Sequence, residues 1–492
     1  MSLRSRRNKT QPRVLFRHQI KAMAAAADSP PTRSQALSGM SQVYASEPAI
    51  PDLFTSQPLI VDMLETESSQ LQQKTIDECL PFLSGEQHAG KCNQHGVPRL
   101  DKQRHVKFLH KQLGRLPPQM AAADPSRPWF FYWSLAALTL LGEDVSIYRE
   151  RLVETVRPIQ NVSGGFGGGF GQDSHLATTY ATVLALMLVG GEEAYKVVDR
   201  RAMWEWLCSL KQADGGFQMV VGGEEDVRGA YCASVIISLL GIPLETSPDS
   251  AAYAAGHKDL FSGLGEWVGR CQTYEGGVAA IPGIEAHGAY AFCALGCLSI
   301  LDAPHRSIPK YMNMPQLIAW LSSRQYAPEG GFSGRTNKLV DGCYSHWVGG
   351  CWPLIQAALS GPNSGKARSA DQQAADTGSL FSRNGLIRYI LCCCQDQTLR
   401  GGLRDKPSKY SDAYHTCYVL SGLSSAQHKW TLRAARPTGS AGGADEWEAM
   451  PYVEDEQVFN EDDRIGTTHP VYVIPQHKVE AAWEYYASKM GF

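Results

Sequence analysis

The sequence predicts an all-α fold made of repeated helix pairs. The first observation behind this prediction is a Gly-Gly pair followed by an apolar residue, which recurs five times and is preceded each time by a Gln. Successive pairs are 51, 61, 54 and 71 residues apart, and a repeat of roughly fifty residues accommodates two helices with their connections. The pairs are Gly164-Gly165, Gly215-Gly216, Gly276-Gly277, Gly330-Gly331 and Gly401-Gly402.

A second regularity follows the first. An acidic residue stands eight to ten positions after the second glycine of each pair, and a chemically active side chain stands two positions beyond it. Acids favour helix starts, where they bind free backbone N–H groups and oppose the positive end of the helix dipole. If five equivalent helices begin this way in a closed ring, the active side chains converge on one mouth. They are Asp173 with His175, Asp226 with Arg228, Glu285 with His287, Asp341 with Cys343, and Asp412 with Tyr414 and His415.

The first part of the chain divides into a tail and the start of the repeats. Residues 1–58 are basic and rich in Ser, Pro and Ala without periodicity, which predicts a disordered extension. Apolar residues at helical spacing predict helices over 59–80 and 99–113. The aromatic run 124–133 opens a further helix, with Pro128 suited to its first turn.

The repeats extend from 59 to 492 in this interpretation, as one domain. Two polar stretches interrupt them, at about 361–377 and 432–465, and we expect these to be insertions. The larger interval between the fourth and fifth glycine pairs accommodates the first of the two.

Composition excludes several classes of function. The 492 residues are 43% apolar and 19% charged, with a net charge of -3, which does not favour nucleic-acid binding. No apolar run approaches the ~20 residues that a membrane-spanning helix needs. The 13 cysteines are odd in number and include the run Cys392, Cys393 and Cys394. Free thiols are typical of a reducing compartment, so we expect a cytoplasmic protein.

The segment 330–347 carries the strongest chemical pattern. Asp341 and Cys343 offer an oxygen and a sulfur ligand for zinc, which needs a third protein ligand if a substrate is to occupy the fourth position. The spacing does not choose that third ligand among His175, His287 and His415. The structural alternative is a helix-capping Asp followed by a buried thiol. Upstream, Arg335 and Lys338 are the donors that phosphate oxygens recruit, which places an anionic leaving group beside the metal.

Aromatic residues form a further group. They fit either a plain hydrophobic core or the wall of an apolar cavity for a hydrocarbon chain. The residues concerned are Trp129, Trp133, Tyr180, Tyr231 and Trp347.

Several long motifs resemble the β subunits of protein prenyltransferases. They are EGGVAAIPGIEAHGAYAFC at 275–293, GGFSGRTNKLVDGCYSHW at 330–347 and GGLRDKPSKYSDAYHTCYVLSGLS at 401–424. Three others, DVRGAYCAS at 226–234, SRPWFFYW at 126–133 and THPVYVI at 468–474, resemble the farnesyltransferase branch of that family. The resemblance covers about 60–490 and implies an α/α barrel, or toroid, of about six inner and six outer helices. It also implies a heterodimer with a helical-repeat α subunit.

The resemblance implies a zinc-dependent transfer of farnesyl from farnesyl diphosphate to the cysteine thiolate of a C-terminal CaaX motif. It selects His415 as the third zinc ligand beside Asp341 and Cys343, and Asp405 as the magnesium ligand. The catalytic residues that it implies are His287, Arg335, Lys338 and Tyr344. Those expected to bind farnesyl diphosphate are His287, Gly288, Ala289, Tyr290, Arg335, Thr336, Asn337, Lys338, Tyr344, Ser345, His346, Trp347, Arg228, Tyr231, Trp129 and Tyr418. Those expected to bind the peptide are Ser126, Trp129, Trp133, His175, Ala177 and Tyr414.

Three positions bear on the alternatives within and outside this family. Trp129 and Tyr418 match the floor of a farnesyl cavity, and Asp405 stands where the geranylgeranyl relative places a Lys, which disfavours a type I geranylgeranyltransferase β subunit. His346 departs from the Phe expected in the family motif. A terpene cyclase is disfavoured because its Asp-x-Asp-Asp motif is missing from the sequence. A non-catalytic helical toroid that serves as a binding scaffold would not need Asp341, Cys343 and His415 together.

Overall fold

A computed structural model describes residues 63–88, 90–362, 379–433, 446–452 and 457–489. The chain divides into two units, Met1–Pro48 and Ala49–Phe492, and all the described residues belong to the second. The predicted extension 1–58 therefore lies outside the described residues, as does most of the predicted insertion 361–377.

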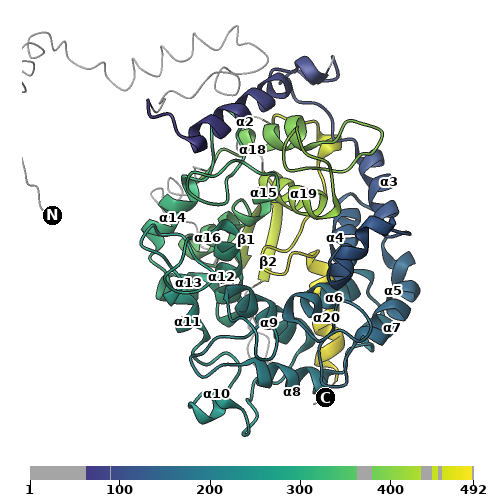
Figure 1. The fold of residues 1–492 in the computed structure, drawn as a ribbon, viewed down its shortest axis with the longest axis vertical. Coiled ribbons are helices and arrows are strands. Elements are labelled where there is room, and N and C mark those ends of the chain that lie inside the picture. The colour runs from purple at the N-terminus through teal and green to yellow at the C-terminus, as the bar shows by residue number, and fades with distance from the viewer. Residues whose placement is uncertain (1–62, 89, 363–378, 434–445, 453–456, 490–492) are drawn as a thin grey trace, which may run out of the picture. The chain divides into compact units, whose positions relative to one another are not determined.

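Six helical segments of the described residues form an inner ring (Figure 1). Each contacts the next in chain order, and the last, α19, returns to contact α4, so the ring is closed. Their apolar residues face all directions, as expected for helices surrounded by protein. The inner helices are α4 (Arg127–Leu140), α6 (Leu176–Val189), α9 (Val227–Leu240), α12 (Gly288–Leu301), the short α15 (Tyr344–Trp347) followed by α16 (Cys351–Ser360), and α19 (Ala413–Gln427).

An outer helix precedes each inner one and lies outside the ring (Figure 1). The last outer helix, α18, continues into a π-helical turn, η7. The alternation of outer and inner helices confirms the predicted α/α toroid. The outer helices are α3 (Lys102–Gln112), α5 (Arg149–Val156), α8 (Arg200–Leu210), α11 (Leu264–Arg270), α14 (Met314–Ser322) and α18 (Arg383–Arg388) with η7 (Tyr389–Cys394).

The glycine pairs mark where each outer helix connects to its inner helix, and they explain how neighbouring units pack. A Cβ on the first glycine, Gly164, would lie 2.0 Å from the carbonyl oxygen of Ala202 in the next outer helix. A Cβ on Gly165 would lie 2.8 Å from the ring of Trp206, four residues further along that helix. Both positions therefore exclude any side chain.

The same contact recurs at every glycine pair. The second glycines pack against aromatic rings in turn, at Trp206, Trp267, Trp320, Tyr389 and Phe108. The last of these, Phe108, lies in α3 at the start of the domain, so Gly401-Gly402 packs the final unit against the first outer helix. The repeat thus encodes ring closure as well as the order of the helices.

The remaining helices lie between or around the units. The predicted helix over 59–80 begins later than expected, at Glu67, where the Thr66 hydroxyl accepts from the Ser69 N–H. The remaining α-helices of the described residues are α2 (Glu67–Leu83), α7 (Glu192–Tyr195), α10 (Ala251–Ala254), α13 (Pro304–Tyr311) and α20 (Gln476–Ala487).

One element departs from the all-α prediction. Strands β1 (His428–Arg433) and β2 (Glu446–Pro451) pair antiparallel, and both reach into the segment 432–465 that was expected to be a polar insertion. Trp430 and Trp447 approach edge to face, with ring centroids 6.4 Å apart. Aromatic pairs across a ribbon stabilise it, and a polar reading of this stretch overlooked them.

The segment after the ribbon closes the inside of the toroid. Val471 and Val473 are buried, and their carbonyl oxygens accept hydrogen bonds from the hydroxyls of Tyr231 (2.6 Å) and Tyr132 (3.0 Å), which belong to inner helices. These bonds satisfy two phenols that would otherwise be costly to bury. Within the described ranges, no helix has both the length and the apolar character required to span a bilayer.

Candidate active site

Three possible metal ligands, from the turn before α15 and from α19, lie close together. The ligand atoms of Asp341, Cys343 and His415 all lie within 4.8 Å of one another. Asp341 also accepts the backbone N–H of Cys343 at 2.9 Å, which fixes the turn that leads into α15. An oxygen, a sulfur and a nitrogen donor at this spacing are the set that zinc accepts. The residues present therefore fit a zinc ion.

The imidazole of His415 is oriented by a second carboxylate. Asp412 accepts the backbone N–H of His415 at 2.7 Å with one oxygen and contacts Nδ1 at 2.7 Å with the other. Nε2 is buried and lies 3.2 Å from Asp341 Oδ1, an ion-pair distance without the direction of a hydrogen bond. A carboxylate on the far nitrogen of a histidine is the usual support for a metal ligand. Nε2 is thus the nitrogen that faces Asp341 and Cys343.

The charges at this site suit the capture of a cation. Burial and the adjacent Asp341 raise the pKa of the Cys343 thiol well above its usual range. Burial alone would lower the pKa of His415, but the carboxylates of Asp341 and Asp412 raise it to about 10. Without a metal, both groups therefore hold protons that a bound cation would displace.

Close packing of two inner helices brings the halves of this site together. A Cβ on Gly422 of α19 would lie 2.3 Å from the Cβ of Ser345 in α15. Ser345 is fully buried, and its hydroxyl has no hydrogen-bond partner among the described residues. Ser345 was expected at farnesyl diphosphate, but the structure places it in this helix contact.

A second group of polar side chains lies beside the metal-ligating group. Nδ1 of His287 caps α12 by accepting the Ala289 N–H at 3.0 Å, so the imidazole proton resides on Nε2. Nε2 donates a hydrogen bond to the Tyr344 hydroxyl at 3.1 Å. The hydroxyl hydrogen of Tyr344 is therefore left to donate to another acceptor. Burial and the Arg335 charge lower the pKa of His287 to about 4, so the ring is neutral at physiological pH.

The turn after the fourth glycine pair supplies two cations. Arg335 pairs with Glu285 at 2.7 Å, and Lys338 is exposed on the same turn, with its N–H bonded to the Arg335 carbonyl oxygen at 3.3 Å. Thr336 instead contacts Glu275 at 3.1 Å, away from His287. Asn337 is exposed at a φ of 58° and provides the bend between the two cations.

The predicted aromatic group forms a connected set of rings. Ring centroids lie 5.4 Å apart for Trp129 and Trp133, 5.3 Å for Trp133 and Tyr414, and 5.0 Å for Tyr414 and Tyr418. Trp347 lies 4.4 Å from Tyr418 and donates its indole N–H to the Tyr414 hydroxyl at 3.0 Å. These rings come from α4, α15 and α19, and Trp129, Trp133 and Trp347 are only partly buried.

The same ring network continues through the other side of the toroid. Trp129 lies 5.8 Å from Tyr180, which lies 5.6 Å from Tyr231. Tyr290 packs against the polar group, with its ring centroid 5.1 Å from that of His287. His346 is buried beneath Tyr418, stacked at 5.0 Å, with Nδ1 bonded to Ser421 at 3.0 Å. His346 thus packs against the aromatic set through Tyr418.

Arg228 and His175 meet around an acid that the motifs did not single out. Arg228 forms ion pairs with Asp226 at 2.5 Å and with Glu224 at 3.6 Å, and His175 Nε2 lies 3.9 Å from the same Glu224. Arg228 was assigned to the farnesyl chain and His175 to the peptide, but the structure groups them. Glu224 lies in the loop before α9, so no helical spacing pointed to it.

Asp405 lies next to the metal-ligating group, in an ion pair. Its two carboxylate oxygens are both 2.6 Å from Lys406 Nζ. Burial and the charge of Asp341 raise its pKa. The Asp405 carboxylate is therefore paired with the Lys406 ammonium group, which a metal ion could replace as its partner.

The five helix starts differ in what caps them. The acid caps the helix at Asp226 and Asp412, as predicted, whereas Asp341 accepts the Cys343 N–H in the turn before α15. In the other two units the cap is the following histidine, with Nδ1 of His175 and His287 accepting the N–H two residues on. The prediction of an acid cap is wrong for those two units, because imidazole nitrogen accepts equally well.

Four smaller residues of the predicted site have backbone or packing roles. Gly288 allows the side chain of Val348 to approach and donates its N–H to the Gly334 carbonyl oxygen at 2.9 Å. Ala177 and Ala289 supply the N–H groups capped by the two histidines. Ser126 is exposed and precedes α4.

Comparison with known proteins is consistent with this arrangement. Residues 100–474 match the model of the prenyltransferase alpha-alpha toroid domain. The protein farnesyltransferase subunit beta of Pyricularia oryzae is 59% identical over 90% of this chain and 85% of its own length. That of Schizosaccharomyces pombe is 36% identical over 86% of this chain and 98% of its own length.

The fold has a counterpart among solved structures. Candida albicans protein geranylgeranyltransferase-I complexed with GGPP superposes with a TM-score of 0.57 at 20% identity, over 79% of this chain and 99% of that chain. At this identity the likeness concerns the fold. The toroid, the extent of the family match and the identity to the two farnesyltransferase subunits agree, and the chain belongs to the protein farnesyltransferase β-subunit family of prenyltransferase enzymes.

Proposed function

We propose that this chain is the catalytic β subunit of a zinc-dependent protein farnesyltransferase. It would transfer farnesyl from farnesyl diphosphate to the cysteine sulfur of a C-terminal CaaX motif, in a heterodimer with an α subunit. The observation that carries this proposal is the convergence of Asp341, Cys343 and His415 within 4.8 Å, in a chain of this family. A binding scaffold would not need these three donors together.

Asp341, Cys343 and His415 would hold the zinc ion, with Asp412 orienting the imidazole. Bound zinc would lower the pKa of the acceptor cysteine and so supply a thiolate at neutral pH. The protein's own contribution is to present the thiolate next to the diphosphate-binding group, which shortens the approach of sulfur to C1.

The polar group around His287 would bind the diphosphate. Tyr344 accepts from His287 and retains a hydroxyl hydrogen to donate to a phosphate oxygen. Arg335 and Lys338 add positive charge on the adjoining turn. Donors fixed where charge develops on the leaving group stabilise the transition state more than the ground state.

The aromatic rings would form the isoprenoid wall, with Tyr290 beside the diphosphate and with Tyr231, Trp347, Tyr418 and Trp129 along the chain. Trp133 and Tyr414 pack between the last two and would face the peptide as well. The group of Arg228, Glu224 and His175 is polar and partly exposed, which suits the peptide better than a hydrocarbon chain.

Asp405 would bind magnesium against the diphosphate. Its carboxylate would exchange the ammonium group of Lys406 for the cation, and the released ammonium could then contact a phosphate oxygen. Carboxylate oxygen is the ligand type that Mg²⁺ prefers.

The test is co-expression with a prenyltransferase α subunit, followed by zinc quantitation and assay of farnesyl transfer. Cys343→Ala and His415→Ala should lose zinc and transfer while still binding farnesyl diphosphate. Cys271→Ala, a buried cysteine of an outer helix, is the control and should retain both. Full transfer by either ligand variant would overturn the zinc assignment.

A further inference from the structure

One backbone carbonyl connects the metal-ligating turn to the loop that carries Asp405. The carbonyl oxygen of Asp405 accepts the N–H of Gly342 at 2.9 Å and the hydroxyl of Tyr389 at 2.8 Å. Gly342 is the residue between Asp341 and Cys343. The two loops are therefore joined at a single oxygen atom, which also accepts a longer contact from the Cys394 thiol at 3.6 Å.

The joint allows little displacement. A Cβ on Gly342 would lie 2.7 Å from the Arg404 carbonyl oxygen and 2.8 Å from Val419. The Arg404 N–H is bonded to the Cys394 carbonyl oxygen at 2.8 Å, so the Asp405 loop is also attached to η7. Tyr389 is fully buried at the start of that π-helical turn. Such wide turns inside outer helices often mark functional sites.

Tyr389 differs from the aromatic residues at equivalent positions of the other units. Trp267 and Trp320 donate their indole N–H groups to acids in the preceding unit's glycine turn, Asp214 at 2.9 Å and Glu275 at 3.2 Å. Among the five equivalent aromatics, only position 389 carries a phenol. Its hydroxyl reaches forward, to the loop that leads into α19.

We propose that Tyr389 is a positioning residue that fixes the Asp405 loop against the metal-ligating turn. This inference rests on the proposed function, because it assigns Tyr389 a role through the zinc and magnesium ligands. By holding the carbonyl of Asp405, Tyr389 sets the separation between the zinc-binding side chains and the carboxylate that faces the diphosphate. The ring of Tyr389 packs against Gly331, so the hydroxyl cannot turn elsewhere without unpacking the unit.

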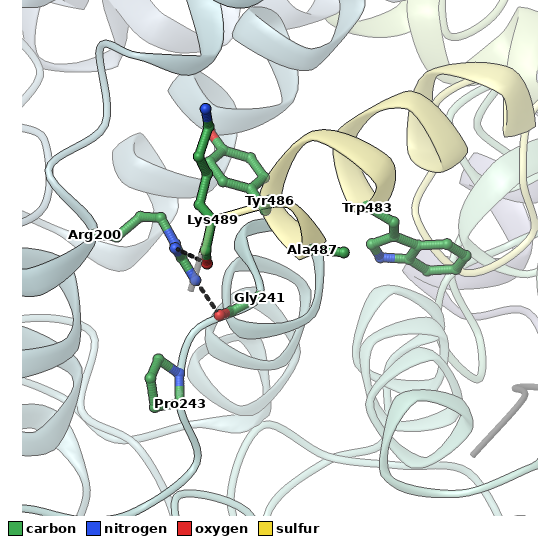
Figure 2. A pocket seen from close by; sticks show the side chains of 7 residues that line it. All are labelled: Arg200, Gly241, Pro243, Trp483, Tyr486, Ala487 and Lys489. Carbon is green, nitrogen blue, oxygen red and sulfur yellow. Dashed lines mark hydrogen bonds between the residues drawn. The ribbon is translucent and has the colours of Figure 1, made fainter. Parts of the chain in front are cut away.

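The experiment compares Tyr389→Phe with a matched control in the heterodimer. Tyr486 is also buried and donates its hydroxyl to a backbone carbonyl, that of Tyr195, at 2.9 Å. It lines a remote pocket of about 380 Å³, where the Arg200 guanidinium binds the carbonyl oxygens of Gly241 and Lys489 (Figure 2). Tyr486→Phe removes the same chemical group from a site that has no contact with the metal ligands.

Zinc affinity is measured by competition with a chromophoric chelator. We expect Tyr389→Phe to bind zinc about fivefold more weakly than the wild type, the equilibrium equivalent of one neutral hydrogen bond. Tyr486→Phe should bind zinc as the wild type does, with a similar loss of thermal stability. The Mg²⁺ concentration for half-maximal transfer should also rise about fivefold in Tyr389→Phe alone, with little change in kcat at saturating Mg²⁺.

Equal zinc affinity in Tyr389→Phe and Tyr486→Phe would overturn the inference. Gly342→Ala is a second variant at the same joint and should weaken zinc binding at least as much, because its Cβ forces the two loops apart. Unchanged zinc affinity there would overturn the inference as well. If the wild type transferred no farnesyl but Tyr389→Phe still bound zinc more weakly, the proposed function would fail while the positioning role would stand.

Discussion

Asp412 has two roles that one substitution can separate. Its Oδ1 accepts the N–H of His415 as the cap of α19, and its Oδ2 holds His415 Nδ1, both at 2.7 Å. Asparagine caps helices as well as aspartate does. Asp412→Asn should therefore keep the cap but place an amide NH₂ group against Nδ1.

That change should alter the tautomer of His415. An NH₂ group donates to Nδ1, so the proton of the neutral imidazole is held on Nε2, the atom that faces Asp341 and Cys343. Protonated Nε2 cannot bind a metal without losing this proton or reorienting the ring. Loss of a supporting carboxylate weakens metal binding by about 10- to 100-fold. Because the cap remains, the free energy of unfolding of the metal-free protein should fall only by the lost ion pair between Asp412 and protonated His415, and by less than in Asp412→Ala.

The assay is zinc competition with a chromophoric chelator, with chemical denaturation of the metal-free protein alongside. Asp412→Ala should lose both zinc affinity and about 1 kcal/mol of unfolding free energy. Asp199→Asn, at the cap of α8 where Oδ1 accepts the Ala202 N–H at 3.0 Å, is the control and should change neither. Wild-type zinc affinity in Asp412→Asn would refute the proposed orientation of His415.

Three further substitutions test the cavity wall and the second metal. His346→Phe removes a buried imidazole whose Nε2 has no hydrogen-bond partner among the described residues, but it also removes the Nδ1 partner of the Ser421 hydroxyl, so it should raise the unfolding free energy at pH 7.5 by less than about 1 kcal/mol. Burial lowers the pKa of His346 to about 3, whereas the pKa in the unfolded chain is about 6.5. The wild type therefore loses stability as the pH falls below about 6.5. The stability advantage of the Phe variant should widen towards pH 5, and a difference that does not change with pH would contradict this. Trp129→Thr should admit geranylgeranyl diphosphate and shift the ratio of kcat/KM for the two diphosphates by about tenfold, whereas an unchanged ratio would count against the floor assignment. Asp405→Lys should make transfer insensitive to added Mg²⁺, and a retained response would remove Asp405 from the magnesium site.

The repeat made the toroid predictable. A glycine pair that excludes any side chain is visible in the sequence, because a Cβ at Gly164 or Gly165 would clash with α8. The helix starts left a similar trace in their acids. Both patterns involve residues close together in the chain, so a single sequence is enough to identify them. The ribbon of β1 and β2 left no such signal, since Trp430 and Trp447, whose rings meet across it, lie on different strands and are not direct partners in the register.

The site was less predictable because its members are chosen by packing between units. Spacing offered three histidines for the third metal ligand, and only the contact of α15 with α19 brings His415 to Cys343. His287 lies in an equivalent register, yet its Nδ1 is taken by the Ala289 N–H and its Nε2 by Tyr344. The repeat in the sequence predicts the position of each histidine within its unit, whereas contacts with the neighbouring unit determine which groups surround its side chain.

The metal-ligating group also depends on how the ring closes. His415 stands on the last inner helix, which must contact both α15 before it and α4 at the start of the domain. Gly401-Gly402 packs the loop before this helix against Arg104 and Phe108 of α3, and Gly422 lets the helix itself approach Ser345. A toroid left open at α3 would free α19 from one of these two constraints. Residues that complete the ring therefore also position His415 beside Asp341 and Cys343.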